Sequence, residues 1–113
     1  CETEMNSMMA GLNCGEVCPP AWEILRKTAE FFITIPDESA ARGMRALARP
    51  GGSDIRIVSG ESGASTAGAL TDIMTNPLCG DVRKQIGLDE NSVVLLFSTE
   101  GDTDRENYRR ITE

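Results

Sequence analysis

Apolar side chains recur at helical spacing in two stretches of the first half of the chain. Residues 21–33 place apolar side chains at every third or fourth position and charged ones on the other face, which predicts an amphipathic helix. Pro36 breaks this run. A second helix is predicted from Asp37, whose side chain can cap it, to about Arg49. We expect both helices to be packing elements.

The second half consists of short apolar runs separated by small and polar residues. Residues 55–58 form a β-rich run, and residues 92–97 are continuously apolar, which is typical of a strand buried on both faces of a parallel sheet. Helices are predicted at about 64–75, at 81–86 and after Asp104, which can cap the last one. This order predicts an α/β fold with a parallel β-α-β-α unit.

The length of 113 residues corresponds to a single domain. We expect a lead-in loop over 1–20, a helical pair over 21–50 and the β-α-β-α unit over 51–113. Because the chain opens at Cys1 without an initiator Met, we interpret it as a fragment of a longer protein.

The charge balance excludes several classes of function. Eleven Lys and Arg against 18 Asp and Glu give a net charge of −7, which argues against nucleic acid as a partner. The chain has no His, the commonest side chain for acid-base catalysis and for binding transition metals. No apolar run approaches the ~18 residues of a membrane helix, so we expect no membrane partner. Because no signal peptide is visible, we expect a cytoplasmic protein with reduced thiols.

Four cysteines lie at Cys1, Cys14, Cys18 and Cys79. Three residues separate Cys14 from Cys18, which fits neither a C-x-x-C redox motif nor a two-plus-two zinc spacing. We therefore expect no metal site. Pairing of Cys14 with a cysteine outside this chain stays open.

Two polar loops follow the predicted strands, at the strand ends where open α/β sheets bind ligands. The loop at 59–63 offers backbone N–H groups at a helix start, a setting that favours anions, although a tight glycine turn explains it equally well. The loop at 98–104 begins with two hydroxyls, which can face a heterocyclic nitrogen as donor or acceptor. The candidate binding residues are Ser59, Gly60, Glu61, Ser62, Gly63, Ser98 and Thr99.

Three motifs carry a family resemblance: MAGLNCGE at 9–16, RIVSGESGA at 56–64 and FSTEGDTD at 97–104. In order and spacing they resemble the C-terminal segment of the diaminopropionate ammonia-lyases, pyridoxal-phosphate enzymes of the tryptophan-synthase β type (fold type II). Val17 and Arg105 depart from the family pattern where Pro is common, and residues 65–67 replace a more apolar helix start. These departures lie beside the motifs.

The resemblance implies that this chain is part of an enzyme of amino-acid degradation. That enzyme would convert 2,3-diaminopropionate to pyruvate and ammonia by β-elimination. It implies pyridoxal 5′-phosphate as cofactor, an amino acid as substrate, the N-terminal remainder of the enzyme as partner, and a homodimer at full length. In related enzymes a hydroxyl matching Ser98 faces the pyridine nitrogen, with Thr99 as the competing candidate, and the Gly60-Glu61 loop passes the cofactor ring.

The Schiff-base lysine of such an enzyme lies outside this chain. Lys27 and Lys84, its only lysines, follow an Arg on polar helical faces and do not resemble a desolvated nucleophile. We therefore expect no catalytic residue here and no activity from the fragment alone. The alternatives are another fold type II lyase, such as a serine or threonine dehydratase, and a non-catalytic acidic α/β binding module.

Overall fold

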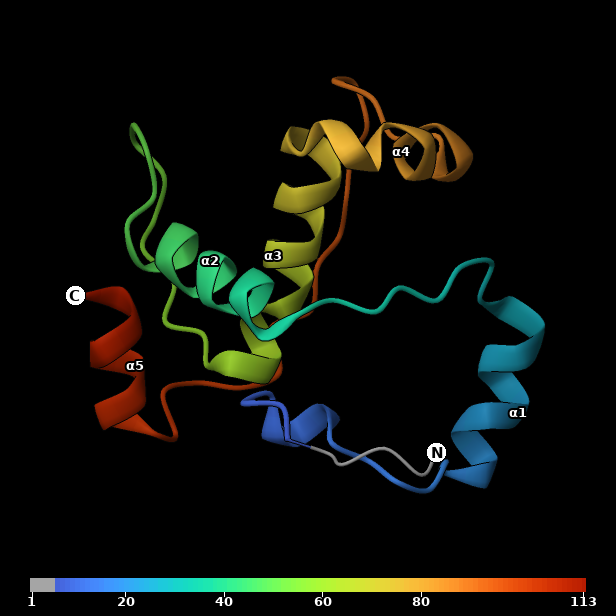
Figure 1. Ribbon diagram of the computed structural model, residues 1–113, viewed down its shortest axis with the longest axis horizontal. Helices are drawn as coiled ribbons and strands as arrows, with labels where there is room; N and C mark the ends of the chain where they lie inside the picture. The colour runs from blue at the N-terminus through green and yellow to red at the C-terminus, as the bar shows by residue number, and fades with distance from the viewer. Residues whose placement is uncertain (1–5) are drawn as a thin grey trace.

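Helices form all the regular structure in residues 6–113, which are the residues that the computed structural model describes (Figure 1). Cys1, on which the fragment interpretation rests, lies outside this range. The helices are η1 (Ala10–Leu12), α1 (Pro19–Thr28), α2 (Asp37–Ala48), α3 (Glu61–Thr75), η2 (Pro77–Cys79), α4 (Gly80–Ile86) and α5 (Arg105–Thr112). The predicted helices are therefore present, with shifted ends.

The core lies where α2 crosses α3, with α5 against α2. Its buried side chains are Met44, Ala48, Ala64 and Tyr108. Gly68 of α3 lets the helices approach closely, because a Cβ built there would lie 1.9 Å from the carbonyl oxygen of Ser39. This crossing fixes the direction in which α3 presents its N-terminus.

A polar cluster joins the same two helices. Arg42 of α2 donates from Nε and Nη2 to the carboxylate of Asp72 of α3, at 2.9 and 2.7 Å, and the buried Ser39 hydroxyl donates to that carboxylate as well. These hydrogen bonds, first that of Arg42, hold the pKa of Asp72 below its usual value. The cluster thus holds the angle between α2 and α3.

The first helix is shorter than predicted. It ends at Thr28, not near residue 33, and its C-cap residue Ala29 has an extended backbone. Pro36 disfavours helical geometry in the residue before it, and the preceding run of β-branched and aromatic residues favours an extended backbone. Trp22 stays 43% exposed, and its ring lies 6.2 Å from that of Phe32 between centroids, in a tilted arrangement.

The predicted cap of α2 was wrong. Pro36 is the N-cap residue, and the side chain of Asp37 makes no cap hydrogen bond. Its carboxylate instead accepts from the Ser7 hydroxyl at 2.5 Å and from the Met8 amide at 2.9 Å, which lowers the pKa of Asp37. Asp37 therefore fastens the start of the described chain to α2.

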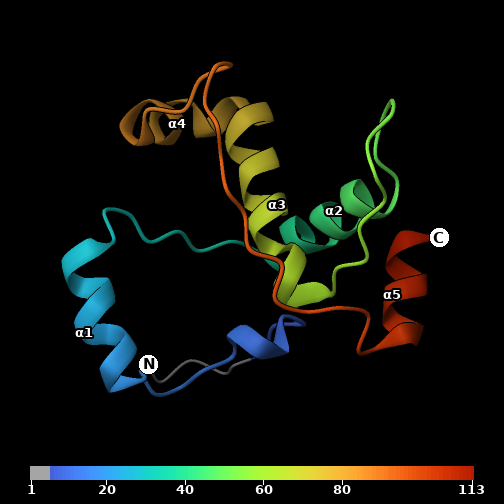
Figure 2. The ribbon, with the colours of Figure 1, turned by 180° about the vertical axis from the view of Figure 1, so that it is seen from behind.

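The parallel-sheet unit is not confirmed, because no strand is present in the described residues 6–113. Segments 55–58 and 92–97 are extended, the first beside α2 and the second beside α3 (Figure 2). They meet only near its N-terminus, where Gly60 N donates to Glu100 O at 3.0 Å. Val93 is fully exposed, although a strand buried on both faces was predicted. A strand needs a hydrogen-bonded neighbour, and these segments do not pair as a ladder with each other.

Candidate functional site

The three sequence motifs meet at the N-terminus of α3. Gly11, in the first motif, donates its amide to the Ser62 hydroxyl at 3.0 Å. The Ser62 amide donates in turn to Glu100 Oε2 at 2.8 Å, so the second motif holds the third. Residues 51 and 38 positions apart in the sequence thus contact one another directly.

Two glycines allow the second and third motifs to touch. A Cβ at Gly60 would lie 2.3 Å from the carbonyl oxygen of Gly101, and one at Gly63 would lie 2.8 Å from that of Glu100. Real Cβ atoms essentially never approach backbone oxygen so closely. Both positions therefore need glycine for close packing of the loops, although neither has a positive φ.

A pair of serine hydroxyls lies at the ends of the two extended segments. Ser59 is fully buried, and its Oγ lies 2.7 Å from Oγ of Ser98, with either atom able to donate. Ser98 and the adjacent Thr99 are exposed. The buried Ser59 hydroxyl can therefore orient the hydroxyl of the exposed Ser98.

Glu61 lies inside the site but faces away from the loop at 98–104. It is 7% exposed, and its carboxylate accepts a hydrogen bond from Nδ2 of Asn107 on α5. The predicted cap Asp104 is confirmed, since its carboxylate accepts from the Asn107 amide at 3.0 Å. Asn107 thus connects α5 to the first turn of α3.

Glu100 is the main residue that the sequence reasoning missed. Its carboxylate occupies the N-terminal end of α3, where the helix dipole and free amides attract negative charge, and it also accepts from Thr103 at 3.3 Å. The predicted preference of the 59–63 loop for an anion is met by the protein's own side chain. The one available signal was the carboxylate in the third motif.

The seven predicted binding residues therefore divide into two groups. Ser59, Gly60, Glu61, Ser62 and Gly63 hold the loops together from within, and Ser98 and Thr99 are exposed. The second group is therefore the more accessible one, since in the first group only Ser62 is half-buried and the others are buried.

Other predicted features lie outside this site. Cys14, Cys18 and Cys79 are free thiols. Among residues 6–113, no three acidic or cysteine side chains are grouped as metal ligands would be. Within the same range, every helix is too short or too polar to cross a membrane.

The chain is similar in sequence to diaminopropionate ammonia-lyases. It is 47% identical over 108 residues to the enzyme of Escherichia coli strain K12, a match that covers 96% of this chain and 27% of that protein. It is 43% identical over 109 residues to the enzyme of Salmonella typhimurium, with the same coverage of both. The chain thus spans about a quarter of the length of these relatives. No family model matches it.

Solved structures of a diaminopropionate ammonia-lyase are similar to this chain as well. The Escherichia coli diaminopropionate ammonia-lyase in complex with an aminoacrylate-PLP azomethine reaction intermediate matches with a TM-score of 0.89 at 47% identity, over 94% of this chain and 28% of that one. The same enzyme in complex with D-serine matches with a TM-score of 0.85 at 48% identity, over 89% and 26%. These matches confirm the resemblance inferred from the three motifs.

Proposed function

Because this chain is homologous to a segment of the diaminopropionate ammonia-lyases, we propose that it is the C-terminal part of a pyridoxal-phosphate-dependent lyase that converts 2,3-diaminopropionate to pyruvate and ammonia. The observation that carries the proposal is 47% identity over 96% of the chain, with all three motifs brought to one place. The active enzyme would be the longer polypeptide, which would work as a cytoplasmic homodimer.

The residues at the site fit one edge of the cofactor. An exposed hydroxyl held by a buried one suits a heteroaromatic nitrogen, because a hydroxyl can donate or accept. The phosphate would have to bind elsewhere, since the loops 59–63 and 98–104 contain no Lys or Arg and Glu100 occupies the N-terminus of α3. This chain would therefore hold the ring, and the remainder of the enzyme would hold the phosphate.

These contacts give the residues of the site separate roles in our proposal. When bound, pyridoxal phosphate supplies an electron sink for the pair freed as the α-proton leaves the amino acid. Ser98 would hold the ring through its pyridine nitrogen, and Ser59 would fix the orientation of the Ser98 hydroxyl. Glu100, Gly60 and Gly63 would keep the two loops in contact.

The reactive amine would come from outside these residues. Lys27 and Lys84 are both exposed, and Lys27 pairs with Glu23 at 3.8 Å. A solvated, protonated ammonium is a poor nucleophile. The remainder of the polypeptide would supply the lysine, and the 113 residues alone would not be active.

The direct test is an assay of the purified longer enzyme with 2,3-diaminopropionate and pyridoxal phosphate. We expect one pyruvate and two ammonia for each diaminopropionate consumed, and neither pyruvate from serine nor 2-oxobutyrate from threonine at comparable rates. Rapid turnover of serine or threonine without turnover of diaminopropionate would favour a dehydratase and contradict the proposal.

The role of the hydroxyls is tested by Ser98→Ala and Thr99→Ala, with Ser92→Ala as a control at the far end of the same extended segment. Loss of one hydrogen bond of about 1 kcal/mol corresponds to roughly fivefold weaker cofactor retention. We expect this loss for Ser98→Ala, together with a shifted cofactor absorption band. An effect of Thr99→Ala alone would assign the contact to Thr99.

A further inference from the structure

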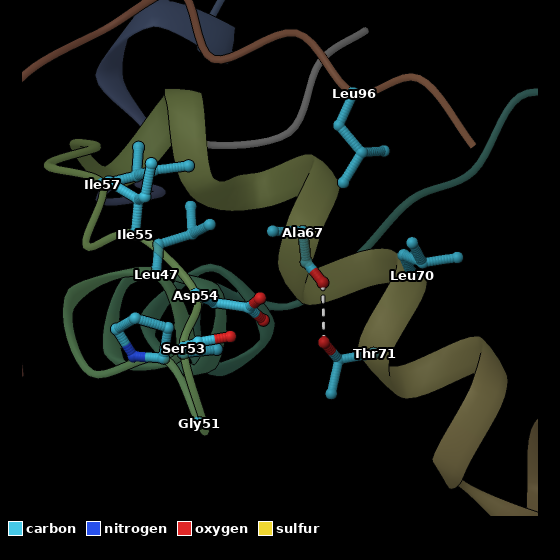
Figure 3. A pocket seen from close by; sticks show the side chains of 12 residues that line it. Leu47, Gly51, Ser53, Asp54, Ile55, Ile57, Ala67, Leu70, Thr71 and Leu96 are labelled. Carbon is cyan, nitrogen blue, oxygen red and sulfur yellow. Dashed lines mark hydrogen bonds between the residues drawn. The ribbon is translucent and has the colours of Figure 1, made fainter. Parts of the chain in front are cut away.

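The loop 59–63 receives no polar support from the surface beside the extended segment that leads into it. Ile57 and Leu96 line an apolar hollow of about 650 Å³ there (Figure 3). Thr71 also lines the hollow, but its hydroxyl already donates to the Ala67 carbonyl at 2.8 Å. The side chains that hold the loop therefore come from another direction.

Asn107 of α5 supports the loop, although it lies outside the three motifs. Its Nδ2 donates to the carboxylate of Glu61, which lies 46 residues earlier in the chain. Glu61 is 7% exposed, and its carboxylate accepts no other hydrogen bond from the residues that the structure describes. Because a buried carboxylate without hydrogen bonds is strongly destabilising, the contact with Asn107 is what makes this burial possible.

Arg110 fixes which end of the Asn107 amide faces Glu61. Nη2 of Arg110 donates to Oδ1 of Asn107. A guanidinium has no acceptor and an ionised carboxylate has no donor, so the amide satisfies both neighbours in one orientation only. Oδ1 then faces Arg110, and Nδ2 faces Glu61. An aspartate at this position would satisfy Arg110 alone.

The backbone of Asn107 is fixed as well. Its amide donates to Oδ1 of Asp104 at 3.0 Å. The next residue, Tyr108, is 5% exposed and belongs to the core cluster with Met44 of α2 and Ala64 of α3. The donor that faces Glu61 therefore has a defined place relative to the first turn of α3.

We propose that Asn107 is a positioning residue of this site. By holding Glu61, it fixes the loop 59–63, which carries Ser59 two residues before Glu61. The Oγ of Ser59 lies 2.7 Å from that of Ser98, so the place of the loop decides where the Ser98 hydroxyl is held. The inference rests on the proposed function, in which Ser98 holds the cofactor ring.

A displacement of Glu61 reaches the serine pair because the loop is closely packed. Gly60 lies between Ser59 and Glu61, and a Cβ on it would lie 2.3 Å from the carbonyl oxygen of Gly101. The Gly60 amide donates to the Glu100 carbonyl at 3.0 Å. A shift of Glu61 therefore moves Ser59 as well, since the residue between them has no free space.

The first experiment is a double-mutant cycle between Asn107→Leu and Ser98→Ala in the longer enzyme, with pyridoxal phosphate as the probe. We measure the dissociation constant and the absorption band of the bound cofactor. Because Asn107 acts through Ser98, Asn107→Leu alone should weaken binding by up to the roughly fivefold effect of Ser98→Ala, and should add nothing once Ser98 is replaced.

The control for this cycle is Asn91→Leu. Asn91 is exposed, and its side chain makes no hydrogen bond with the residues that the structure describes, so cofactor binding should not change. An equal loss of affinity from Asn107→Leu with and without the Ser98 hydroxyl would overturn the inference. A loss no larger than that of Asn91→Leu would overturn it too.

The second experiment reverses the hydrogen bond, which keeps the role testable if Asn107→Leu does not fold. Asn107→Asp places a carboxylate against Glu61 and should weaken cofactor binding and shift the absorption band. When Glu61→Gln is added, the glutamine amide can donate to the new carboxylate, and both properties should return to within about twofold of the unmodified enzyme. Without this recovery, the charge of Glu61 and not its position would be what the site needs, and the inference would be wrong.

Hydrogen exchange of the enzyme without cofactor separates this inference from the proposed function. Asn107→Asp should speed exchange of the amides of 60–64 by at least about tenfold, and the added Glu61→Gln should reverse this. That result in an enzyme that neither binds pyridoxal phosphate nor consumes diaminopropionate would refute the function and leave the positioning of the loop intact. An active enzyme in which Asn107→Asp changes neither exchange nor cofactor affinity would refute only the positioning role.

Discussion

Replacement of Gly68 by Ala tests the crossing of α2 and α3. The new Cβ would lie 1.9 Å from the Ser39 carbonyl oxygen and 2.6 Å from its carbon, against an ordinary contact of ~3.5 Å. Both obstructing atoms belong to the backbone of a helix, so no side-chain rotation relieves the clash. The helices would have to separate by roughly 1.5 Å, which also strains the hydrogen bonds of Asp72.

The destabilisation caused by the clash is partly offset by the higher helix propensity of Ala. Overpacking of this kind costs about 3 kcal/mol, and Ala gains about 1 kcal/mol over Gly in helix propensity. We therefore expect Gly68→Ala to lower the free energy of unfolding of the longer enzyme by about 2 kcal/mol. Gly80→Ala is the matched control, because Gly80 has helical φ and ψ and no atom within 4 Å of a Cβ. It should be neutral or stabilising by up to about 1 kcal/mol.

The free energies of unfolding of the two variants and of the unmodified enzyme are measured by thermal and denaturant unfolding. If Gly68→Ala is as stable as Gly80→Ala, the helices do not cross at Gly68 and the core is wrongly described.

Two further predictions concern polar contacts. Asp104→Ala should destabilise α5 by about 1 kcal/mol, because the hydrogen bond that caps the Asn107 amide is lost. Asp104→Asn should keep most of this stability, so equal losses in the two variants would contradict the capping role. Because folding lowers the pKa of Asp72, its hydrogen bonds to Arg42 and Ser39 stabilise the protein at pH values above the unfolded pKa of about 3.9. This stability is lost as the pH falls through the lower pKa of the folded state. Unfolding measured from pH 6 to pH 2 should therefore show a shallower acid loss in Asp72→Asn, and an unchanged slope would refute this.

The helices were predictable because their signals are local. Repeats of apolar residues and the breaks at Pro36 and Pro77 depend only on neighbouring residues, so α2, α3 and α4 appear close to where the sequence places them. The early end of α1 was missed because its apolar face finds no helix to pack against, and propensity then favours the extended backbone after Thr28.

The strands were not predictable from local signals, because a strand is defined by its hydrogen-bonded partner. The runs at 55–58 and 92–97 were predicted as strands of a parallel sheet, but the described residues contain no strand, and Val93 and Leu95 are exposed.

The loops of the site were identified from their position after the extended runs. The part played by Glu100 depends on where Ser62 lies in space, 38 residues away, and no spacing rule predicts it.

The contacts that unite the three motifs also constrain the order of folding. Gly11 to Ser62, Ser59 to Ser98 and Ser62 to Glu100 each close a loop of 38 residues or more, which is entropically costly before other structure exists. The helix pair α2 and α3 is complete at Thr75, so it can form before the segment that carries Glu100 is present. During synthesis, the segment that carries Glu100 leaves the ribosome after both helices. We therefore expect the site to assemble last, because a chain truncated before Glu100 would lack the loop that completes the site and also Tyr108, which α5 contributes to the core.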